Sequence, residues 1–291
     1  MSGDNTPSCC ASCGTAEIDD VKLKDCDGCD LVKYCSDECR EDHKSEHKKE
    51  CKERAAELRD ELLFKQPEGN HMGDCPICMI PLPLDQQKST LKSCCSKVIC
   101  NGCSHANIIR EDKMRLQHTC PFCRDPMPKT KEDYCKLLKK RIEANDPVAM
   151  LQEGMNQRKK GNYRSAIDYY SKAAELGDAD AHFMLSILYR MGHGVEKDRR
   201  KEIYHLEEAA ISGQSDARNL LGCHEWNGGN SDRAVKHWII AATQGNDDAI
   251  KDLIDAFKDG LISKENLAST LRAHQAAVDA MKSQQREEAE V

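Results

Sequence analysis

Residues 173–181 read AAELGDADA, residues 209–217 read AAISGQSDA and residues 241–249 read AATQGNDDA. Each segment contains an alanine pair, then a glycine, a short polar stretch and a final alanine. The alanine pairs recur at intervals of 36 and 32 residues, and internal periods of this length indicate stacked helical hairpins. Small alanines let two helices approach closely, and each glycine can end a helix in a left-handed conformation. The second half of the chain is therefore predicted to be an α-solenoid.

The same pattern predicts where the helices of this array begin and end. Asp146 before Pro147 is typical of a capped helix start, since proline is tolerated at the first helical position. A polar C-terminal helix and tail should follow the array at residues 264–291. We expect helix pairs at residues 147–159 with 164–176, 180–191 with 199–211, and 216–226 with 231–243, and a further helix near 247–258.

Two details of the array resemble a known repeat family. Residues 192–198 are similar to the loop of a Sel1-like repeat, as is the spacing from Tyr204 through Ala210 to Gly213. The first and third units lack four loop residues and are closer to tetratricopeptide spacing. The resemblance covers residues 146–260 and implies a concave surface that binds another protein. Most of the large aromatic residues should pack between helices; they are Trp226, Trp238, Tyr169 and Tyr170.

The amino-acid composition limits the classes of protein to which this chain can belong. The chain has 291 residues, of which 4% are aromatic and 32% charged, so several small units or a helical array are favoured over one large β-rich core. The formal net charge is -7, which disfavours a nucleic-acid partner. The sequence opens without a basic and apolar leader and has no apolar run of membrane-spanning length. We therefore expect a soluble intracellular protein, cytoplasmic or nuclear, with no membrane partner.

The cysteines are unevenly distributed. Sixteen of the 18 lie before residue 124, and only Cys135 and Cys223 lie beyond it. Thiols stay reduced inside cells, so dense cysteines there indicate metal binding rather than disulfides. The sequence therefore predicts a metal-binding half and a repeat half.

The first cysteine module spans residues 10–51. It contains four ligand pairs with two or three intervening residues, which suits two ligands on one tetrahedral ion. Eight ligands imply two zinc ions, which should supply most of the folding free energy of so short a segment. The pairs are Cys10 and Cys13, Cys26 and Cys29, Cys35 and Cys39, and His47 and Cys51.

The order and spacing of these pairs, with Tyr34 before Cys35, resemble the MYND finger. The resemblance implies interleaved pairs. One ion would be held by Cys10, Cys13, Cys35 and Cys39, and the other by Cys26, Cys29, His47 and Cys51. Cys9 offers an alternative register, but Cys10 has the two-residue spacing, so Cys9 is interpreted as spare.

MYND fingers bind short proline-containing peptides in a groove that carries a glutamine and a tryptophan. Here those two positions are Arg40 and Lys44. The aromatic wall of the groove is therefore missing, and we expect weak binding of proline-rich peptides and a preference for acidic ones. A charged helix over residues 52–66 and a linker over residues 67–74 should follow the finger.

The second cysteine module spans residues 75–124. Ile77 lies in its first pair, Pro121 lies in its last pair with Arg124 directly after, and Ile108 and Ile109 mark a central helix. These features resemble a RING finger. The resemblance assigns Cys75, Cys78, Cys100 and Cys103 to one zinc ion, and Cys94, Cys95, Cys120 and Cys123 to another, so four zinc ions are expected in total.

This module departs from a standard RING at its third and fourth ligands. Lys97 stands where many RINGs have histidine, and an ammonium group cannot ligate zinc. Cys94 and Cys95 are adjacent, and adjacent side chains of an extended strand point to opposite faces, so a shared ion requires a turn there. The alternatives use one of these two cysteines with His118, or use His105.

The predicted fold is mostly α-helical, with two small zinc-stabilised cross-brace modules before an α-solenoid. The predicted function is a zinc-binding protein-interaction protein of the RING-type E3 ubiquitin ligase class or a ligase subunit, whose repeats recruit a partner. By resemblance, Ile77 and Pro121 would contact a ubiquitin-conjugating enzyme and Arg124 would bridge to ubiquitin. No catalytic side chain is expected, because RING domains act by positioning. The alternative is a non-enzymatic adaptor, and the sequence leaves this choice open.

Overall fold

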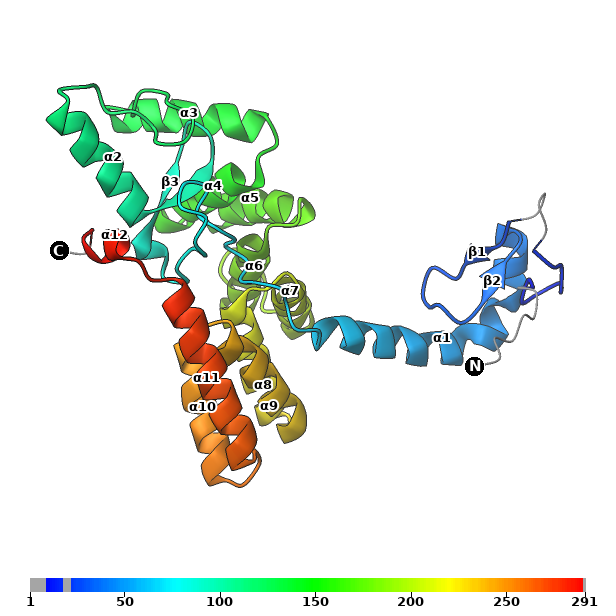
Figure 1. The fold of residues 1–291 in the computed structure, drawn as a ribbon. Helices are drawn as coiled ribbons and strands as arrows, with labels where there is room; N and C mark the ends of the chain where they lie inside the picture. Colours follow the sequence, from blue (N-terminus) through cyan, green and yellow to red (C-terminus); the bar gives the residue numbers. More distant parts are fainter. Residues whose placement is uncertain (1–8, 18–21, 290–291) are drawn as a thin grey trace. The chain divides into compact units, whose positions relative to one another are not determined.

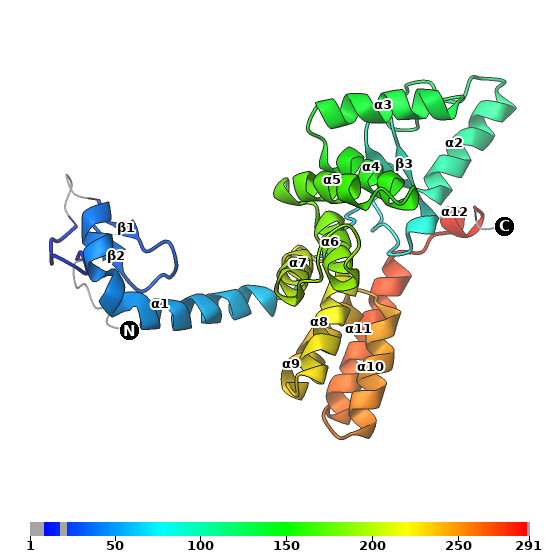
Figure 2. The same ribbon diagram turned by 180° about the vertical axis from the view of Figure 1, so that it is seen from behind.

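The computed structural model describes residues 9–17 and 22–289, which form two compact units, Met1–Lys65 and Gln66–Val291 (Figures 1 and 2). Both units are mainly helical, as predicted. Within the described part of the chain, no helix combines the length and the apolar character that crossing a bilayer requires.

The first unit contains a short hairpin and one long helix. Strands β1 (Lys24–Asp25) and β2 (Lys33–Tyr34) pair antiparallel, and α1 (Asp37–Leu63) follows. Ser36 caps α1 by accepting a hydrogen bond from the backbone N–H of Cys39. Within α1 only His47 and Leu63 are buried, so packing of an apolar face does not account for this helix. The charged stretch that the sequence predicts as a helix is the second half of α1.

The second cysteine module begins the second unit. A 3-10 turn, η1 (Gln86–Lys88), leads into β3 (Ser89–Lys92), which pairs antiparallel with β4 (Lys97–Cys100). Helix α2 (Asn101–Lys113) starts directly after β4. Leu82 and Ile99 are fully buried and form a small core with the cysteines. Both isoleucines that mark α2 in the sequence are exposed, and the helix packs through Cys103 and Asn107 instead.

The helical array follows at residues 131–280. The bounds of its seven helices between residues 147 and 258 agree with the predicted ones to within one residue at each end, because the alanine, glycine and capping positions that define them are local signals. The helices are α3 (Lys131–Glu143), α4 (Pro147–Lys159), α5 (Tyr163–Glu175), α6 (Ala179–Met191), α7 (Arg199–Ile211), α8 (Ser215–Asn227), α9 (Ser231–Thr243), α10 (Asp247–Lys258) and α11 (Lys264–Ala280).

Two hairpins of the array, α4 with α5 and α8 with α9, each pack a glycine of the first helix against a large aromatic residue of the second. Gly154 lies against Tyr170, where an added Cβ would be 2.5 Å from the ring. Gly222 lies against Trp238, where an added Cβ would be 2.4 Å from Nε1. Tyr170 and Trp238 are buried, as predicted for most array aromatics, whereas Trp226 is 37% exposed. Glycine is therefore required at the points of closest approach between paired helices.

The C-terminal segment differs from the predicted single polar helix. Helix α11 ends at Ala280, and a separate short helix, α12 (Gln284–Glu287), follows after a break. Figures 1 and 2 both show α12 beside the start of α2, in the second cysteine module. The break turns the chain off the array and places residues more than 180 positions away beside the cysteines.

The predicted linker lies against the repeat helices instead of crossing solvent. The Gln244 side chain donates to the Gly69 carbonyl at 3.2 Å, and the His71 backbone N–H donates to the Gly213 carbonyl at 3.3 Å. The imidazole of His71 is buried, and its Nε2 lies 3.1 Å from Asp180 Oδ1. These contacts attach the second cysteine module to the start of α6 and to the turns that follow α7 and α9.

The pair of His71 and Asp180 should make this attachment dependent on pH. Burial acts to lower the pKa of His71, but its hydrogen bond to Asp180 and the negative charges of Asp180, Asp216 and Asp178 raise it. Burial likewise acts to raise the pKa of Asp180, but the hydrogen bond with His71 lowers it. The stabilisation from His71 is complete below about pH 6.5 and is lost as pH rises through its folded-state pKa. The stabilisation from Asp180 is present above about pH 3.9 and is lost as pH falls through the folded-state pKa of Asp180.

We therefore expect His71→Gln to lower the free energy of unfolding more at about pH 6 than at about pH 8. His118→Gln is the matched control, because His118 forms an exposed pair with Asp112. Burial also raises the pKa of neighbouring Asp178 to about 6, so each variant is compared with the wild type at the same pH. Urea unfolding followed by circular dichroism measures the difference, and an equal or larger loss at pH 8 would contradict the expectation.

Candidate metal centres

The sixteen predicted zinc ligands gather in four groups of four. Within each group the ligand atoms all lie within 4.8 Å of one another. In both modules the pairs alternate along the chain, the first pair joining the third and the second joining the fourth. The groups are Cys10, Cys13, Cys35 and Cys39; Cys26, Cys29, His47 and Cys51; Cys75, Cys78, Cys100 and Cys103; and Cys94, Cys95, Cys120 and Cys123.

The distances and the donor atoms fit zinc. Sulfurs on a tetrahedral ion with bonds of about 2.3 Å are about 3.8 Å apart. Cys95 Sγ and Cys120 Sγ are 3.8 Å apart, and Cys13 Sγ and Cys35 Sγ are 3.5 Å apart. All the cysteines are free thiols. Thiolate sulfur with a single imidazole is the ligand set of structural zinc sites, which have no open position for a substrate.

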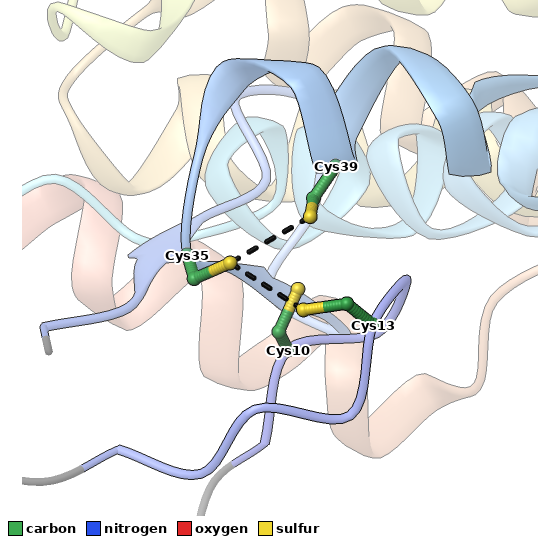
Figure 3. Close-up of side chains that lie close together, drawn as sticks. All are labelled: Cys10, Cys13, Cys35 and Cys39. Atoms are coloured by element: carbon green, nitrogen blue, oxygen red, sulfur yellow. Dashed lines mark hydrogen bonds between the residues drawn. The ribbon is translucent and has the colours of Figure 1, made fainter.

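The first centre joins a turn near the N-terminus to the start of α1. Cys35 follows β2 and Cys39 lies in the first turn of α1, and Figure 3 shows both side chains directed toward Cys10 and Cys13. The Sγ atoms of Cys35 and Cys39 are 3.6 Å apart. Cys9 is exposed and lies outside this group.

The second centre joins the hairpin to the middle of α1. His47 is only 5% exposed, and its Nε2 lies 3.1 Å from Cys29 Sγ. Cys51 lies one helical turn further on, and its Sγ is 3.8 Å from Cys26 Sγ. A Cβ on Gly28 would be 2.9 Å from Cys51 Sγ, so the close approach requires glycine there.

The pKa values of the clustered thiols are shifted in both directions from that of an ordinary cysteine. Hydrogen bonds with Cys13 and Cys39 raise the pKa of Cys35 to about 12. Burial acts to raise the pKa of Cys10, but backbone hydrogen bonds outweigh it and lower this pKa to about 6. Burial similarly acts against the backbone hydrogen bonds at Cys75, whose pKa falls to about 7. Four adjacent thiols therefore cannot all lose their protons without a positive charge nearby. A divalent cation would supply that charge.

The adjacent cysteines of the second module face the same group. Cys94 Sγ lies 3.4 Å from Cys123 Sγ, and Cys95 Sγ lies 3.8 Å from Cys120 Sγ. The turn that the sequence requires is present between β3 and β4, where Ser96 has a positive φ of 53°. The turn removes the alternation of an extended strand, so both sulfurs can reach one point.

The alternative ligands lie elsewhere. His118 Nε2 is 2.8 Å from Asp112 Oδ1, and His105 is exposed on α2. Neither belongs to any of the four groups found among the described residues. Lys97 also lies outside them, and its Nζ is 5.8 Å from the ring centre of Phe122.

Three of the cysteine pairs share a backbone turn that the sequence pattern did not reveal. The residue after the second cysteine has a positive φ, which is 72° at Gly14, 56° at Met79 and 66° at Arg124. Its backbone N–H donates to the carbonyl of the first cysteine at 2.9 Å in all three turns. Only the first of these positions is a glycine, so Met79 and Arg124 adopt a conformation that larger residues disfavour.

A buried lysine lies beside the fourth group. Lys92 is 4% exposed, and its Nζ donates to Ser104 Oγ at 2.7 Å. Burial lowers the pKa of Lys92, and the charges of Cys120 and Cys94 act against that effect. A zinc ion with four thiolates carries net negative charge, so a buried ammonium group nearby is electrostatically favourable.

The three predicted enzyme-contact residues differ in exposure. Ile77 is 41% exposed in the first turn of the module, and Arg124 is exposed in the last. Arg124 Nη1 donates to Asn107 Oδ1 at 3.2 Å. Pro121 is buried and offers little surface to a partner.

Two further apolar residues of these turns are exposed and were missed by the sequence reasoning. Met79 is 70% exposed and Phe122 is 44% exposed. Their positions inside or directly after the cysteine pairs were the available signal, although position alone does not decide exposure, because Pro121 lies inside the last pair and is buried.

The first unit contains a groove of about 760 Å³ beside the second centre. Arg40 and Lys44 line it as predicted, and Lys48 and Lys52 continue the row at four-residue spacing on one face of α1. Arg40 is paired with Asp27, which also lines the groove. The groove is therefore rich in cations.

Comparison with known proteins identifies two parts of the chain. The MYND finger family matches residues 10–51. The Sel1 repeat family matches residues 149–178, 179–214 and 215–246, so the first and third units are also Sel1 repeats, despite their tetratricopeptide-like spacing. The chain contains a MYND finger and three Sel1 repeats.

Two solved structures resemble the chain. The Sel1 repeat protein from Oxalobacter formigenes has a TM-score of 0.46 and 24% identity, over 62% of this chain and 74% of that chain. The antigen c5321 of uropathogenic Escherichia coli, which displays an SLR fold, has a TM-score of 0.40 and 22% identity, over 56% of this chain and 35% of that chain.

These features define a class of protein. The MYND finger and the cysteine groups make the chain a zinc-binding protein, and the Sel1 repeats make it a protein-interaction protein.

Proposed function

We propose that this protein is a RING-type E3 ubiquitin ligase or a subunit of one. The second cysteine module, residues 75–124, would recruit a ubiquitin-conjugating enzyme, and the repeats at residues 146–260 would recruit a partner protein. Each cysteine module would hold two zinc ions through the groups described above, giving four ions per chain. Its place in the cell would be the cytoplasm or the nucleus.

The observation that carries this proposal is the alternating pairing in the second module. One group contains Cys75 and Cys100, and the other contains Cys94 and Cys120, so the two centres interlock along the chain. Two closed centres would hold the first and last turns in fixed positions with Ile77 exposed on one and Arg124 exposed on the other. A ligase of this type needs only such a rigid surface, because it accelerates transfer by positioning.

The attachment of this module to the repeats supports a ligase with a fixed geometry. The predicted linker contacts the second and third repeats, and α12 lies beside α2. A conjugating enzyme on the module and a substrate on the repeats would then be held within one rigid body. Holding two reactants in place raises their effective concentration.

The second candidate is a non-enzymatic adaptor, and two observations favour it. Pro121 is buried, and Arg124 is hydrogen-bonded to Asn107 inside the module. A conjugating enzyme would meet less apolar surface, and the arginine would have to leave its partner before bridging to ubiquitin.

Autoubiquitination of the full chain across a panel of conjugating enzymes decides between the two candidates. If the protein is a ligase, Ile77→Ala and Arg124→Ala should each abolish transfer without loss of zinc, because they remove the apolar contact and the bridging donors. Matched controls are Leu116→Ala and Arg115→Ala, two exposed residues of the same module, the second also with a positive φ. Wild-type protein that is silent with every enzyme supports the adaptor.

The groove of the first unit should bind proline-rich peptides poorly. An aromatic hot spot commonly contributes more than about 2 kcal/mol, and Arg40 and Lys44 replace the amide and aromatic contacts. We expect an acidic peptide to bind more tightly than a proline-rich one, and Lys48→Glu to weaken only the acidic peptide. Titration calorimetry with the full chain tests this, and micromolar binding of the proline-rich peptide would refute it.

A further inference from the structure

The side chain of Arg286 is buried among groups of the second cysteine module. It is 7% exposed although it belongs to the four-residue helix α12 near the C-terminus. Its Nη1 donates to the Pro81 carbonyl at 2.7 Å, and its Nη2 donates to the Ile80 carbonyl at 3.0 Å and lies 3.6 Å from Cys78 Sγ. The Met281 carbonyl accepts a further hydrogen bond at 2.6 Å. The guanidinium group therefore joins the backbone after the first cysteine pair to the end of α11.

The backbone of α12 also lies against the third centre, the group of Cys75, Cys78, Cys100 and Cys103. A Cβ on Gly102, between two of these ligands, would be 2.7 Å from the Gln285 carbonyl oxygen and 2.9 Å from Arg286 Cα. The contact leaves no room for a side chain, so glycine is required there. Gln285 Oε1 lies 3.9 Å from Cys103 Sγ. Two ligands of the centre thus have a neighbour from the C-terminal segment.

At each of the two centres of the second module, a buried cation lies near the cysteine ligands. Zinc with four thiolates leaves about two net negative charges at each centre. At the fourth centre the nearby buried cation is Lys92, which belongs to the module itself. At the third centre the corresponding cation is Arg286, which comes from the other end of the chain. Donors that contact the ligands but not the metal orient thiolate ligands and disperse their charge through hydrogen bonds.

We propose that Arg286 is the outer-sphere partner of the third zinc centre, so that the functional second module consists of residues 75–124 together with residues 281–287. Zinc retention at the third centre then depends on the C-terminal segment. This inference rests on the proposed zinc binding, but not on ubiquitin transfer.

The test measures zinc loss centre by centre in the full chain. Each protein is mixed with a chelator and N-ethylmaleimide, and mass spectrometry follows the alkylation of individual cysteines. In Arg286→Met we expect the four cysteines of the third centre to become reactive about 10- to 100-fold faster, with little change at the fourth centre. Arg272→Met is the matched control, since Arg272 is an exposed arginine on α11.

The outcomes distinguish a third centre that holds no zinc from a third centre that holds zinc without the help of Arg286. Rapid alkylation of the third centre in wild-type protein would show that it holds no zinc, which is a failure of the proposed zinc binding. If the cysteines of the third centre are equally protected from alkylation in the wild type and in Arg286→Met, the proposed role of Arg286 is overturned. If Arg286→Met does not fold, Arg286→Lys decides, because lysine cannot reach Cys78 and three carbonyls together. Faster alkylation at the third centre supports the proposal, and an unchanged rate overturns it.

Discussion

Removal of zinc should unfold both cysteine modules and leave the repeat helices folded. Helix α1 buries only His47 and Leu63, so it has little besides its ligands to hold it against the hairpin. The two described core clusters of the array, around Tyr170 and around Trp238, contain no residue from the cysteine modules. Structural zinc supplies on the order of 10 kcal/mol to small zinc-stabilised folds, whereas repeats derive their stability from packing between neighbours.

Native mass spectrometry and circular dichroism check this expectation. The zinc-loaded chain should carry four ions, and because fifteen cysteine ligands ionise it should be about seven charges more negative than the formal -7. After chelation the spectrum should lose the contribution of α1 and α2 and retain that of α4–α10. Two or fewer ions per chain, or loss of all helical signal in one transition, would show the prediction to be wrong.

Replacement of Trp238 by alanine should destabilise the array by about 3–5 kcal/mol, the usual cost of removing a buried aromatic side chain. Trp238 is 4% exposed in the core formed by α9, α10 and α11. Trp226 is the matched control, because its ring lies 5.5 Å from that of Trp238 but is 37% exposed. Trp226→Ala should cost about 1 kcal/mol, the value of an aromatic pair. Urea unfolding of the zinc-loaded protein measures both.

Gly222 makes the same contact testable from its other side. Gly222→Ala should cost about 1–3 kcal/mol, because its Cβ would overlap the indole of Trp238. In the double variant the indole is absent, so the cost of the alanine should largely disappear. Strict additivity of the two single variants in a double-mutant cycle would contradict the packing described here.

The sequence by itself determined most of the local structure. The alanine pairs and glycines at residues 173–181, 209–217 and 241–249 predicted the helices of the array to within one residue, because capping and close helix packing depend on residue type at defined positions. The sixteen grouped ligands were also visible as pairs, since each pair would bind one ion from a single short turn of the chain.

Only the tertiary structure decided how distant segments meet. The pattern could not show that Cys94 and Cys95 face one group, because this depends on the turn at Ser96. It could not place His71 against Asp180 or Arg286 against Cys78, which are separated by more than 100 residues. A buried ion pair or a guanidinium beside a thiolate leaves no periodic signal in a sequence. Such contacts are specified by the packing of elements that are each determined locally.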